Sequence, residues 1–177
     1  MDILVLGAYG LLGSHLCASL SKNSYKVFRQ GSSVDAELSF LPYLDDKLLK
    51  VIEKNKPKVI INLIALTNVD NCEKDPNLAY LLNVKTVEKI IQAKAYFDFH
   101  LIHLSTDQVY SGAGIHKESC VNPVNVYGIT KYCSELLASK IDSTIIRTNY
   151  HSKSLVSKRF SFSDWLVNSF KNRERIT

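Results

Sequence analysis

The stretch Tyr127-Gly128-Ile129-Thr130-Lys131 pairs a phenol with an amine at a spacing that suits acid–base chemistry. If it opens a helix, positions i and i+4 lie one turn apart on the same face, which places Tyr127 beside Lys131. A nearby cation lowers the pKa of a tyrosine from its usual value of about 10 and makes proton exchange with a bound alcohol or carbonyl practical. The chain has nine tyrosines, so chance also produces this spacing, and the alternative is an ordinary pair on a helix surface.

A glycine turn near the N-terminus predicts a site for a diphosphate. Gly7, Gly10 and Gly13 follow the apolar strand Ile3–Leu6, and leucines at helical spacing come next. Gly7 permits the tight turn, Gly10 lets the backbone approach a pyrophosphate, and Gly13 allows the helix to pack closely on the strand. The helix N-terminus offers free N–H groups and a positive dipole end to the phosphates. The alternative is a glycine-rich turn that binds no ligand.

The end of the second expected strand, Tyr25–Phe28, bears on which dinucleotide would bind. An NAD-preferring protein typically places an acidic residue there on the ribose 2′-hydroxyl. This chain has Arg29 instead, followed by a glutamine, a glycine and two serines. A guanidinium with small polar groups suits the 2′-phosphate of NADP, so we expect NADP(H), with NAD(H) as the alternative. An exposed arginine that binds nothing would give the same pattern.

Strands and helices alternate along the chain, which predicts an α/β fold: a Rossmann-like doubly wound parallel sheet with helices on both faces. The continuous apolar run Val59–Ala65 is typical of a strand buried on both faces, and His100–Leu104 and Ser143–Arg147 are further strands. We expect helices near Leu44–Ile52, Pro76–Ala95, Tyr127–Leu137 and Ser163–Phe170, a polar loop at Thr67–Glu73 and an irregular stretch at Ser111–Pro123.

Three motifs are expected to meet at one edge of this sheet. Gly7–Gly13, Ala65–Thr67 and Ser105–Thr106 each follow a strand. Ligands of open α/β sheets bind outside the carboxyl ends of the strands. This convergence is the main argument from the residues themselves for an enzyme.

Composition and charge are those of an ordinary globular protein of one domain or slightly more. The 177 residues are 46% hydrophobic and 22% charged, with a net charge of +5. Lys and Arg outnumber Asp and Glu by six to two in residues 151–177, but they form no dense basic run, so we expect neither a nucleic-acid nor a membrane partner. No apolar run approaches the roughly 20 residues that cross a bilayer. The four cysteines have no paired spacing, and scattered free thiols favour a reducing cytoplasm. Neither these cysteines nor the five histidines have metal-ligand spacing, so we expect no metal site.

Taken together, the motifs resemble those of the extended short-chain dehydrogenase/reductases. Their signature set corresponds to Gly7-x-x-Gly10-x-x-Gly13, Ser105-Thr106-Asp107 and Tyr127-x-x-x-Lys131. The segment Ile61–Glu73 is similar to the pattern Asn-x-x-Ala-x-Thr-x-Val-Asp-x-x-Glu, and this narrows the resemblance to the dTDP-4-dehydrorhamnose reductases and related nucleotide-sugar reductases. The resemblance covers roughly residues 1–150.

The resemblance implies an NAD(P)-dependent oxidoreductase that reduces the C4 keto group of a nucleotide-linked deoxysugar. It implies that Tyr127 protonates the developing alkoxide, that Lys131 holds the nicotinamide ribose and lowers the pKa of the tyrosine, and that Thr106 hydrogen-bonds the carbonyl oxygen. Donors placed in this way stabilise the charge that appears on oxygen in the transition state. The residues expected to bind the dinucleotide are Gly7, Tyr9, Gly10, Leu11, Leu12, Gly13, Arg29, Glu37, Leu38, Ala65, Leu66, Thr67, Tyr127 and Lys131.

Some positions depart from the family pattern. Glu37-Leu38 falls where the family usually has Asp-Leu near the adenine, and Gln108 stands where an aromatic residue is common. His15 occupies a position where some of these reductases carry a glutamate used for metal at a dimer contact, so we expect no such metal and leave a homodimer open.

The relatives continue well beyond the length of this chain. We expect residues 1–150 to form an NAD(P)-binding Rossmann domain and residues 151–177 to begin a truncated substrate-binding region, with the substrate subdomain largely missing. Two alternatives stay open. One is a nucleotide-sugar epimerase or dehydratase. The other is a non-catalytic NAD(P)-binding regulatory subunit, such as that of methionine adenosyltransferase, which resembles the same reductases.

Overall fold

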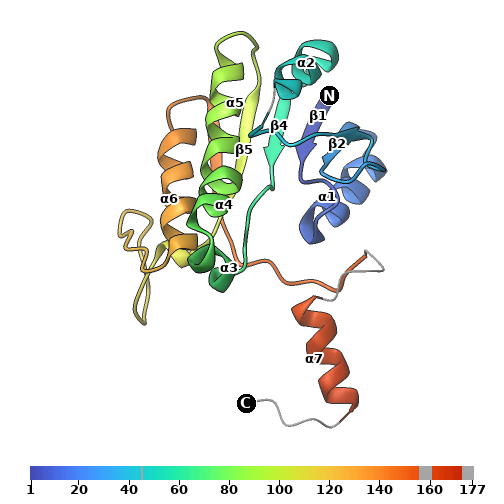
Figure 1. Ribbon diagram of the computed structural model, residues 1–177. Helices are drawn as coiled ribbons and strands as arrows, with labels where there is room; N and C mark the ends of the chain where they lie inside the picture. The colour runs from blue at the N-terminus through green and yellow to red at the C-terminus, as the bar shows by residue number, and fades with distance from the viewer. Residues whose placement is uncertain (45, 156–160, 173–177) are drawn as a thin grey trace.

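Six parallel strands form the sheet at the centre of the molecule (Figure 1). The computed structural model describes residues 1–44, 46–155 and 161–172. The strand order is β3-β2-β1-β4-β5-β6. After β1 the strands β2 and β3 are added on one side, and β4, β5 and β6 are then added on the other. The topological switch point therefore lies between β1 and β4, which is where open α/β sheets bind ligands. The strands are β1 (Asp2–Leu6), β2 (Lys26–Gly31), β3 (Leu38–Ser39), β4 (Val59–Asn62), β5 (His100–Ser105) and β6 (Ser143–Arg147).

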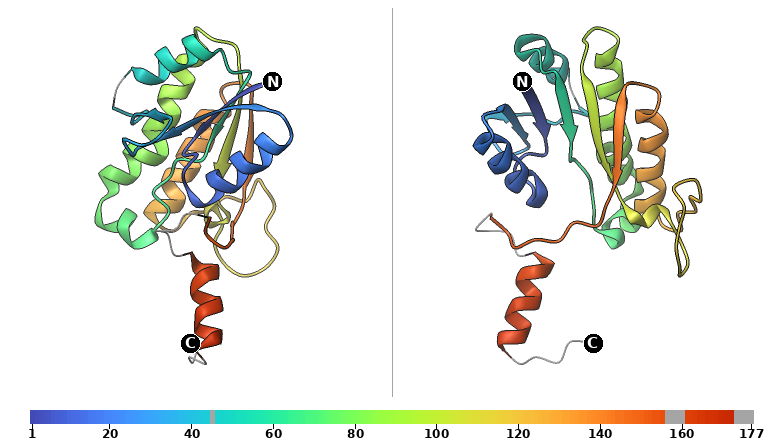
Figure 2. Two further views of the ribbon diagram at one scale, coloured as in Figure 1. Left: turned by 90° about the vertical axis from the view of Figure 1, so that its right-hand side faces the viewer. Right: turned by 180° about the vertical axis from the view of Figure 1, so that it is seen from behind.

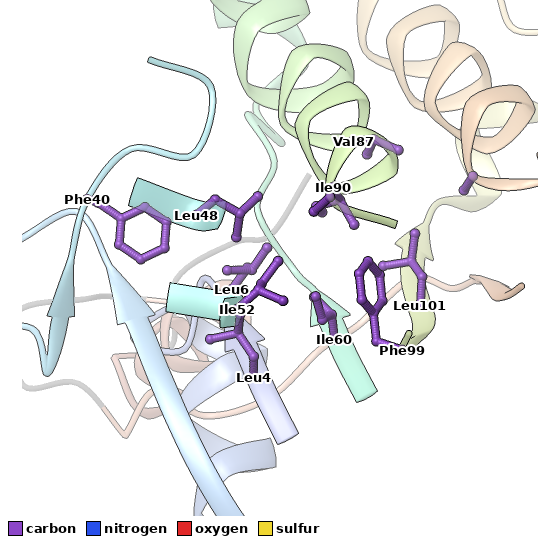
Figure 3. Packing of buried hydrophobic residues seen from close by; sticks show 12 residues of the cluster. Leu4, Leu6, Phe40, Leu48, Ile52, Ile60, Val87, Ile90, Phe99 and Leu101 are labelled. Carbon is purple, nitrogen blue, oxygen red and sulfur yellow. The ribbon is translucent and has the colours of Figure 1, made fainter. Parts of the chain in front are cut away.

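Alternate residues of β1 build two apolar layers, because successive side chains of a strand point to opposite faces. Leu4 and Leu6 enter the larger cluster, which also takes residues from α2 (Lys47–Asn55), α5 (Thr86–Lys94) and α6 (Val126–Ala138) (Figure 3). Ile3 and Val5 enter the smaller cluster, which they share with residues of α1 (Leu11–Lys22). The predicted doubly wound parallel sheet with helices on both faces is therefore confirmed.

The connection from β4 to α5 contains more helix than the sequence predicted. The polar stretch expected as a loop includes α3 (Val69–Lys74), so that prediction was wrong. Asn68 starts this helix, because its side chain accepts the backbone N–H of Asn71 at 2.8 Å. The long helix expected at Pro76–Ala95 is divided into α4 (Pro76–Tyr80), a π-helical turn at Leu81–Lys85 and α5.

The strand β4 is shorter than the apolar run Val59–Ala65 that predicted it. It ends at Asn62, whose side-chain oxygen accepts the backbone N–H of Ile64 at 3.2 Å. This local bond turns the chain out of the sheet. The two-residue strand β3 was not predicted, because a segment so short carries no hydrophobic period.

The segment after β6 runs past the carboxyl ends of the strands towards α1, and α7 (Phe162–Lys171) then projects away from the sheet (Figures 1 and 2). A capping box starts α7: Ser161 accepts the N–H of Asp164, and Asp164 accepts the N–H of Ser161. The helix expected at Ser163–Phe170 is this one. None of the described helices combines the length and apolar character that crossing a membrane requires.

Candidate functional site

A pocket of about 660 Å³ lies at the carboxyl ends of the strands, where β1 and β4 are neighbours. Four stretches of predicted site residues reach it: the glycine turn, the end of β4, the end of β5 and the start of α6. The lining consists of Gly7, Tyr9, Gly10, Leu11, Leu12, Gly13, Gly31, Ser32, Ser33, Leu63, Ile64, Ala65, Thr67, Leu104, Ser105, Thr106, Asp107, Gln108, Tyr127, Thr148, Asn149 and Tyr150.

The glycine turn has the backbone geometry of a diphosphate cradle. Gly7 adopts a φ of +79°, a conformation that L side chains rarely adopt. A Cβ on Gly13 would lie 2.3 Å from the carbonyl oxygen of Gly7, so only glycine lets α1 approach the turn this closely. Gly10 is the N-cap of α1 and has no side chain to cap it, which leaves the first N–H groups of the helix for a ligand.

A buried glutamine on β2 holds this turn in place. The side-chain oxygen of Gln30 accepts the N–H of Gly7 at 2.9 Å, and its backbone oxygen accepts the N–H of Ala8 at 2.9 Å. Its amide nitrogen donates to the carbonyl oxygen of Phe40 at 2.5 Å. With 1% of its surface exposed, Gln30 has all of these partners within the protein. The residues present therefore fit the phosphates of a dinucleotide.

The structure does not bring Arg29 to the pocket. Its guanidinium donates from Nη2 to Oγ of Ser21 at 3.0 Å, on the face of the sheet covered by α1. Leu38 packs against the larger apolar cluster instead of lining the pocket, and the side chain of Glu37 is exposed outside it. The expectation that Arg29 provides the positive charge for a 2′-phosphate has no support in this geometry. Gly31, Ser32 and Ser33 line the pocket at this end.

Tyr127 and Thr106 lie together at the other end of the pocket. Asn125 caps α6 by accepting the N–H of Gly128 at 2.7 Å. A Cβ on Gly128 would lie 2.5 Å from the backbone oxygen of Gln108, so the glycine allows α6 to start directly against the turn that carries Thr106. Tyr127 and Thr106 are 8% and 4% exposed, respectively.

The pKa of Tyr127 differs from the expectation. Burial raises the pKa of its phenol above the ordinary value, and a side-chain hydrogen bond with Thr106 only partly opposes this effect. Cys72 and Asp107 add smaller increases. The expected lowering by Lys131 does not occur in this arrangement.

Lys131 is buried behind the pocket wall. Its ammonium donates to the carbonyl oxygen of Leu104, a lining residue, at 2.5 Å, and only 2% of its surface is exposed. Burial lowers the pKa of Lys131 from 10.5 to about 8, while Glu135, one turn further along α6, acts in the opposite direction. Lys131 itself does not line the pocket.

The π-helical turn places one residue that the sequence did not single out. Asn83 accepts the backbone N–H of Leu66 at 2.7 Å and donates to the carbonyl oxygen of the same residue at 3.3 Å. It also donates to Oγ1 of Thr130 on α6 at 2.9 Å. Turns of this kind are frequent at functional sites. Asn83 thus holds the loop after β4 against α6, the helix that carries Tyr127. Ala65 and Thr67 of this loop line the pocket.

An ion pair under the pocket joins β6 to α6. Arg147 donates to both carboxylate oxygens of Glu135, with the shortest distance, 2.6 Å, from Nη2 to Oε2. Glu135 also accepts a hydrogen bond from Ser105, and Arg147 donates to the hydroxyl of Tyr110 at 2.7 Å. The hydrogen-bonded carboxylate of Glu135 raises the pKa of the Arg147 guanidinium above its ordinary value. This network connects the end of β5 to α6.

The segment after β6 crosses the pocket, which the sequence did not predict. Asn149 donates to Asp107 at 3.2 Å on one side. On the other side, Nε2 of His15 lies 2.9 Å from the carbonyl oxygen of Lys153 and 2.8 Å from Oγ of Ser152. The crossing residues, Thr148 to Tyr150, line the pocket. The rule that ligands bind at carboxyl ends of strands could have identified them, because they follow β6 directly.

Within the described residues, the pocket collects most of the predicted site and leaves part of it outside. The predicted residues that line it are Gly7, Tyr9, Gly10, Leu11, Leu12, Gly13, Ala65, Thr67, Thr106 and Tyr127; those that do not are Arg29, Glu37, Leu38, Leu66 and Lys131. No group of three or more His, Cys, Asp or Glu side chains in the described ranges could hold a metal ion.

The strand order and the glycine turn define a Rossmann-like dinucleotide-binding fold. A family model described as the RmlD substrate binding domain matches residues 1–176, and the chain belongs to this family. The resemblance to the dTDP-4-dehydrorhamnose reductases, expected from the motifs, is confirmed.

Two curated relatives and one solved structure illustrate the similarity. The dTDP-4-dehydrorhamnose reductase of Aggregatibacter actinomycetemcomitans is 35% identical over 154 residues, which are 84% of this chain and 51% of that protein. The methionine adenosyltransferase 2 subunit beta of Xenopus laevis is 35% identical over 136 residues, which are 75% of this chain and 41% of that protein. The dTDP-4-dehydrorhamnose reductase of Bacillus anthracis, solved in complex with NADP, superposes with a TM-score of 0.85 at 25% identity over 99% of this chain and 61% of that chain. The chain spans about half the length of the curated relatives it matches.

Proposed function

We propose that this chain binds NADP(H), with NAD(H) as the alternative, in the pocket at the carboxyl ends of the strands. We further propose that it provides the cofactor-binding part of an oxidoreductase that reduces the C4 keto group of a nucleotide-linked deoxysugar. One observation carries the proposal: the glycine turn, Thr106 and Tyr127 all line a single pocket. The NADP complex of the Bacillus anthracis relative supports the choice of cofactor.

Residues 1–150 form the dinucleotide-binding unit in this proposal, and residues 151–177 begin the substrate-binding region. The backbone of the turn Gly7–Gly13 and the N-terminus of α1 bind the pyrophosphate. Tyr9, Leu11, Leu12, Ala65 and Thr67 line its surroundings. The protein is cytoplasmic, and its partner is a nucleotide sugar.

Tyr127 acts as the proton donor. A bound reduced nicotinamide supplies a hydride to the carbonyl carbon, and the oxygen then needs a proton. The phenol of Tyr127 is protonated at neutral pH, because burial raises its pKa from an ordinary value of about 10, and it is the group that can give a proton to this oxygen. Thr106 lies beside the phenol and provides a second hydroxyl for the developing charge.

Lys131 acts from behind the pocket wall. Its ammonium holds the carbonyl oxygen of Leu104, and this contact positions the end of β5 that carries Thr106. The resemblance also implies contact with the nicotinamide ribose. An ammonium has three N–H donors, and the carbonyl of Leu104 uses one of them, so a ribose contact is compatible with this hydrogen bond.

Binding of NADPH and NADH to the purified chain tests the proposal, by fluorescence or calorimetry, with Gly10→Val as the control. We expect the unchanged chain to bind a dinucleotide and Gly10→Val not to bind it, because a side chain at the N-cap of α1 stands where the phosphates approach. Absence of binding to both dinucleotides would overturn the proposal.

A non-catalytic dinucleotide-binding subunit is the second candidate, supported by the 35% identity to methionine adenosyltransferase 2 subunit beta. Incubation with NADPH and a 4-keto sugar nucleotide, followed by product analysis, separates the candidates. Formation of a 4-hydroxy sugar with matched consumption of NADPH supports the reductase. A parallel incubation with a 4-hydroxy sugar nucleotide and the oxidised dinucleotide that gives an epimerised or dehydrated sugar, with no net change in the dinucleotide, would identify an epimerase or dehydratase. Binding without any turnover favours the non-catalytic subunit.

A further inference from the structure

Tyr9 connects the glycine turn to the loop after β2. Its hydroxyl oxygen accepts the backbone N–H of Glu37 at 2.9 Å. Its ring lies against Gly31: a Cβ at that position would be 2.7 Å from Cδ2 of Tyr9 and 3.0 Å from Cβ of Ala36. The ring is thus held at both ends, yet 43% of the residue stays exposed, and it lines the pocket.

The phenol of Tyr9 retains a proton to donate. A tyrosine hydroxyl is one donor and also an acceptor, and the Glu37 N–H uses only its accepting capacity. No acceptor for its O–H lies among the described residues. The hydroxyls of Ser32 and Ser33 line the same end of the pocket and are exposed. Three neutral donors therefore surround the end of β2.

No cation joins these donors within the described lining of the pocket. The single charged residue there is Asp107, which belongs to the end of β5. Arg29, the guanidinium of β2, does not line the pocket and donates instead to the hydroxyl of Ser21 on α1. Neutral donors can bind either a ribose 2′-hydroxyl or a 2′-phosphate, but they form the stronger bond with the charged phosphate.

We propose that Tyr9, together with Ser32 and Ser33, contacts the 2′ position of the adenosine ribose and distinguishes a 2′-phosphate from a 2′-hydroxyl there. This inference rests on the proposed dinucleotide site and names its specificity-determining residue. The site accepts both NADPH and NADH, because its described lining at the end of β2 holds neither a carboxylate that rejects the phosphate nor a cation that requires it. The Tyr9 hydroxyl tilts the preference towards NADPH.

Dissociation constants of NADPH and NADH, measured by the fluorescence of the nicotinamide, test the proposal on the full chain and on Tyr9→Phe. Phenylalanine keeps the ring against Gly31 and removes only the hydroxyl. We expect the unchanged chain to bind the two dinucleotides within about tenfold of each other, because all three donors are neutral. We expect Tyr9→Phe to weaken NADPH about tenfold and NADH no more than about threefold, because a bond to a charged group contributes more than a bond to a neutral one.

Two control variants make the comparison specific. Tyr25→Phe removes the hydroxyl of another tyrosine that is 40% exposed and outside the pocket, and Arg29→Gln removes the guanidinium. Neither should change the ratio of the two dissociation constants. Ser32→Ala/Ser33→Ala provides a second route to the same subsite and should lower the preference for NADPH even if Tyr9→Phe folds poorly, as judged by its circular dichroism.

The ratio of the two dissociation constants in each variant decides whether Tyr9 determines the dinucleotide specificity. A ratio that moves towards NADH in Tyr9→Phe and in the serine double variant, but not in the controls, supports the assignment. A ratio unchanged within about twofold in both test variants, or a larger shift in Arg29→Gln than in Tyr9→Phe, would overturn it while leaving the dinucleotide site intact. Absence of binding to either dinucleotide in the unchanged chain would overturn the proposed function, and this inference with it.

Discussion

Replacing Lys131 with methionine should remove a rise in stability that the unchanged chain shows at alkaline pH. Lys131 is 2% exposed, and burial lowers its pKa from 10.5 to about 8. Between these values the unfolded chain carries a proton on this amine and the folded chain does not. The unfolded state then binds more protons, so the free energy of unfolding increases with pH.

The structure gives the size of this effect. The difference between a pKa of 10.5 and one of about 8 corresponds to roughly 3–4 kcal/mol, at roughly 1.4 kcal/mol per pKa unit. Below pH 8 both states are charged, and burial of the charge imposes this full cost on the folded state. Integrating the linkage relation from pH 7 to pH 10 recovers roughly 2–3 kcal/mol of it. Methionine has a similar length and no charge, so its contribution should not vary with pH.

Urea denaturation at pH 7, 8, 9 and 10 measures the difference. The free energy of unfolding of the unchanged chain minus that of Lys131→Met should rise by roughly 2–3 kcal/mol across this range. Subtraction cancels the tyrosines and cysteines that titrate in both proteins. The loss of the hydrogen bond to Leu104 adds a constant to this difference, so it does not contribute to the rise with pH. Parallel curves for the two proteins would refute the reasoning and show that the ammonium is well solvated.

Two further predictions concern the packing around the pocket. Gly13→Ala should lower the free energy of unfolding by about 1–3 kcal/mol or more, because the added methyl carbon would lie 2.3 Å from the carbonyl oxygen of Gly7. Urea denaturation measures this change. The control Ser19→Ala, on the exposed side of the same helix, should change the free energy of unfolding by no more than about 0.5 kcal/mol. A Gly13→Ala variant as stable as the unchanged chain would contradict the observed close approach. Arg147→Met should cost about 3–5 kcal/mol in the same assay, because it leaves the carboxylate of Glu135, whose side chain is 5% exposed, without its cation. Arg147→Met/Glu135→Leu should recover part of this loss, and a double variant that is no more stable than the single one would exclude the buried charge as the cause.

The fold could be predicted from local patterns because its main signals are local. A continuous apolar run, a glycine turn and leucines at helical spacing each act within a few residues. The positive φ of Gly7 and the close approach at Gly13 are properties of a single turn, which the glycine spacing already indicates. Where the prediction was wrong, at α3, a polar stretch was stabilised by the cap from Asn68, a signal that periodicity does not include.

The site could be predicted only in part, because side chains reach across elements that are distant in sequence. Arg29 is next to the pocket along the chain, but it points to the face covered by α1. Tyr9 meets Glu37, 28 residues away, and His15 meets Lys153, 138 residues away. No spacing in the sequence encodes these contacts.

By itself, the sequence determined the strand–turn–helix unit with its glycines, the pairing of Tyr127 with Lys131 on one helix, and the family that these motifs indicate. Only the tertiary structure decided the pKa values of Tyr127 and Lys131. It buries Lys131 behind Leu104 and raises the pKa of Tyr127 instead of lowering it. The physical reason is that a pKa depends on the solvent and charge that surround a group, and that environment is assembled from strands and helices far apart along the chain.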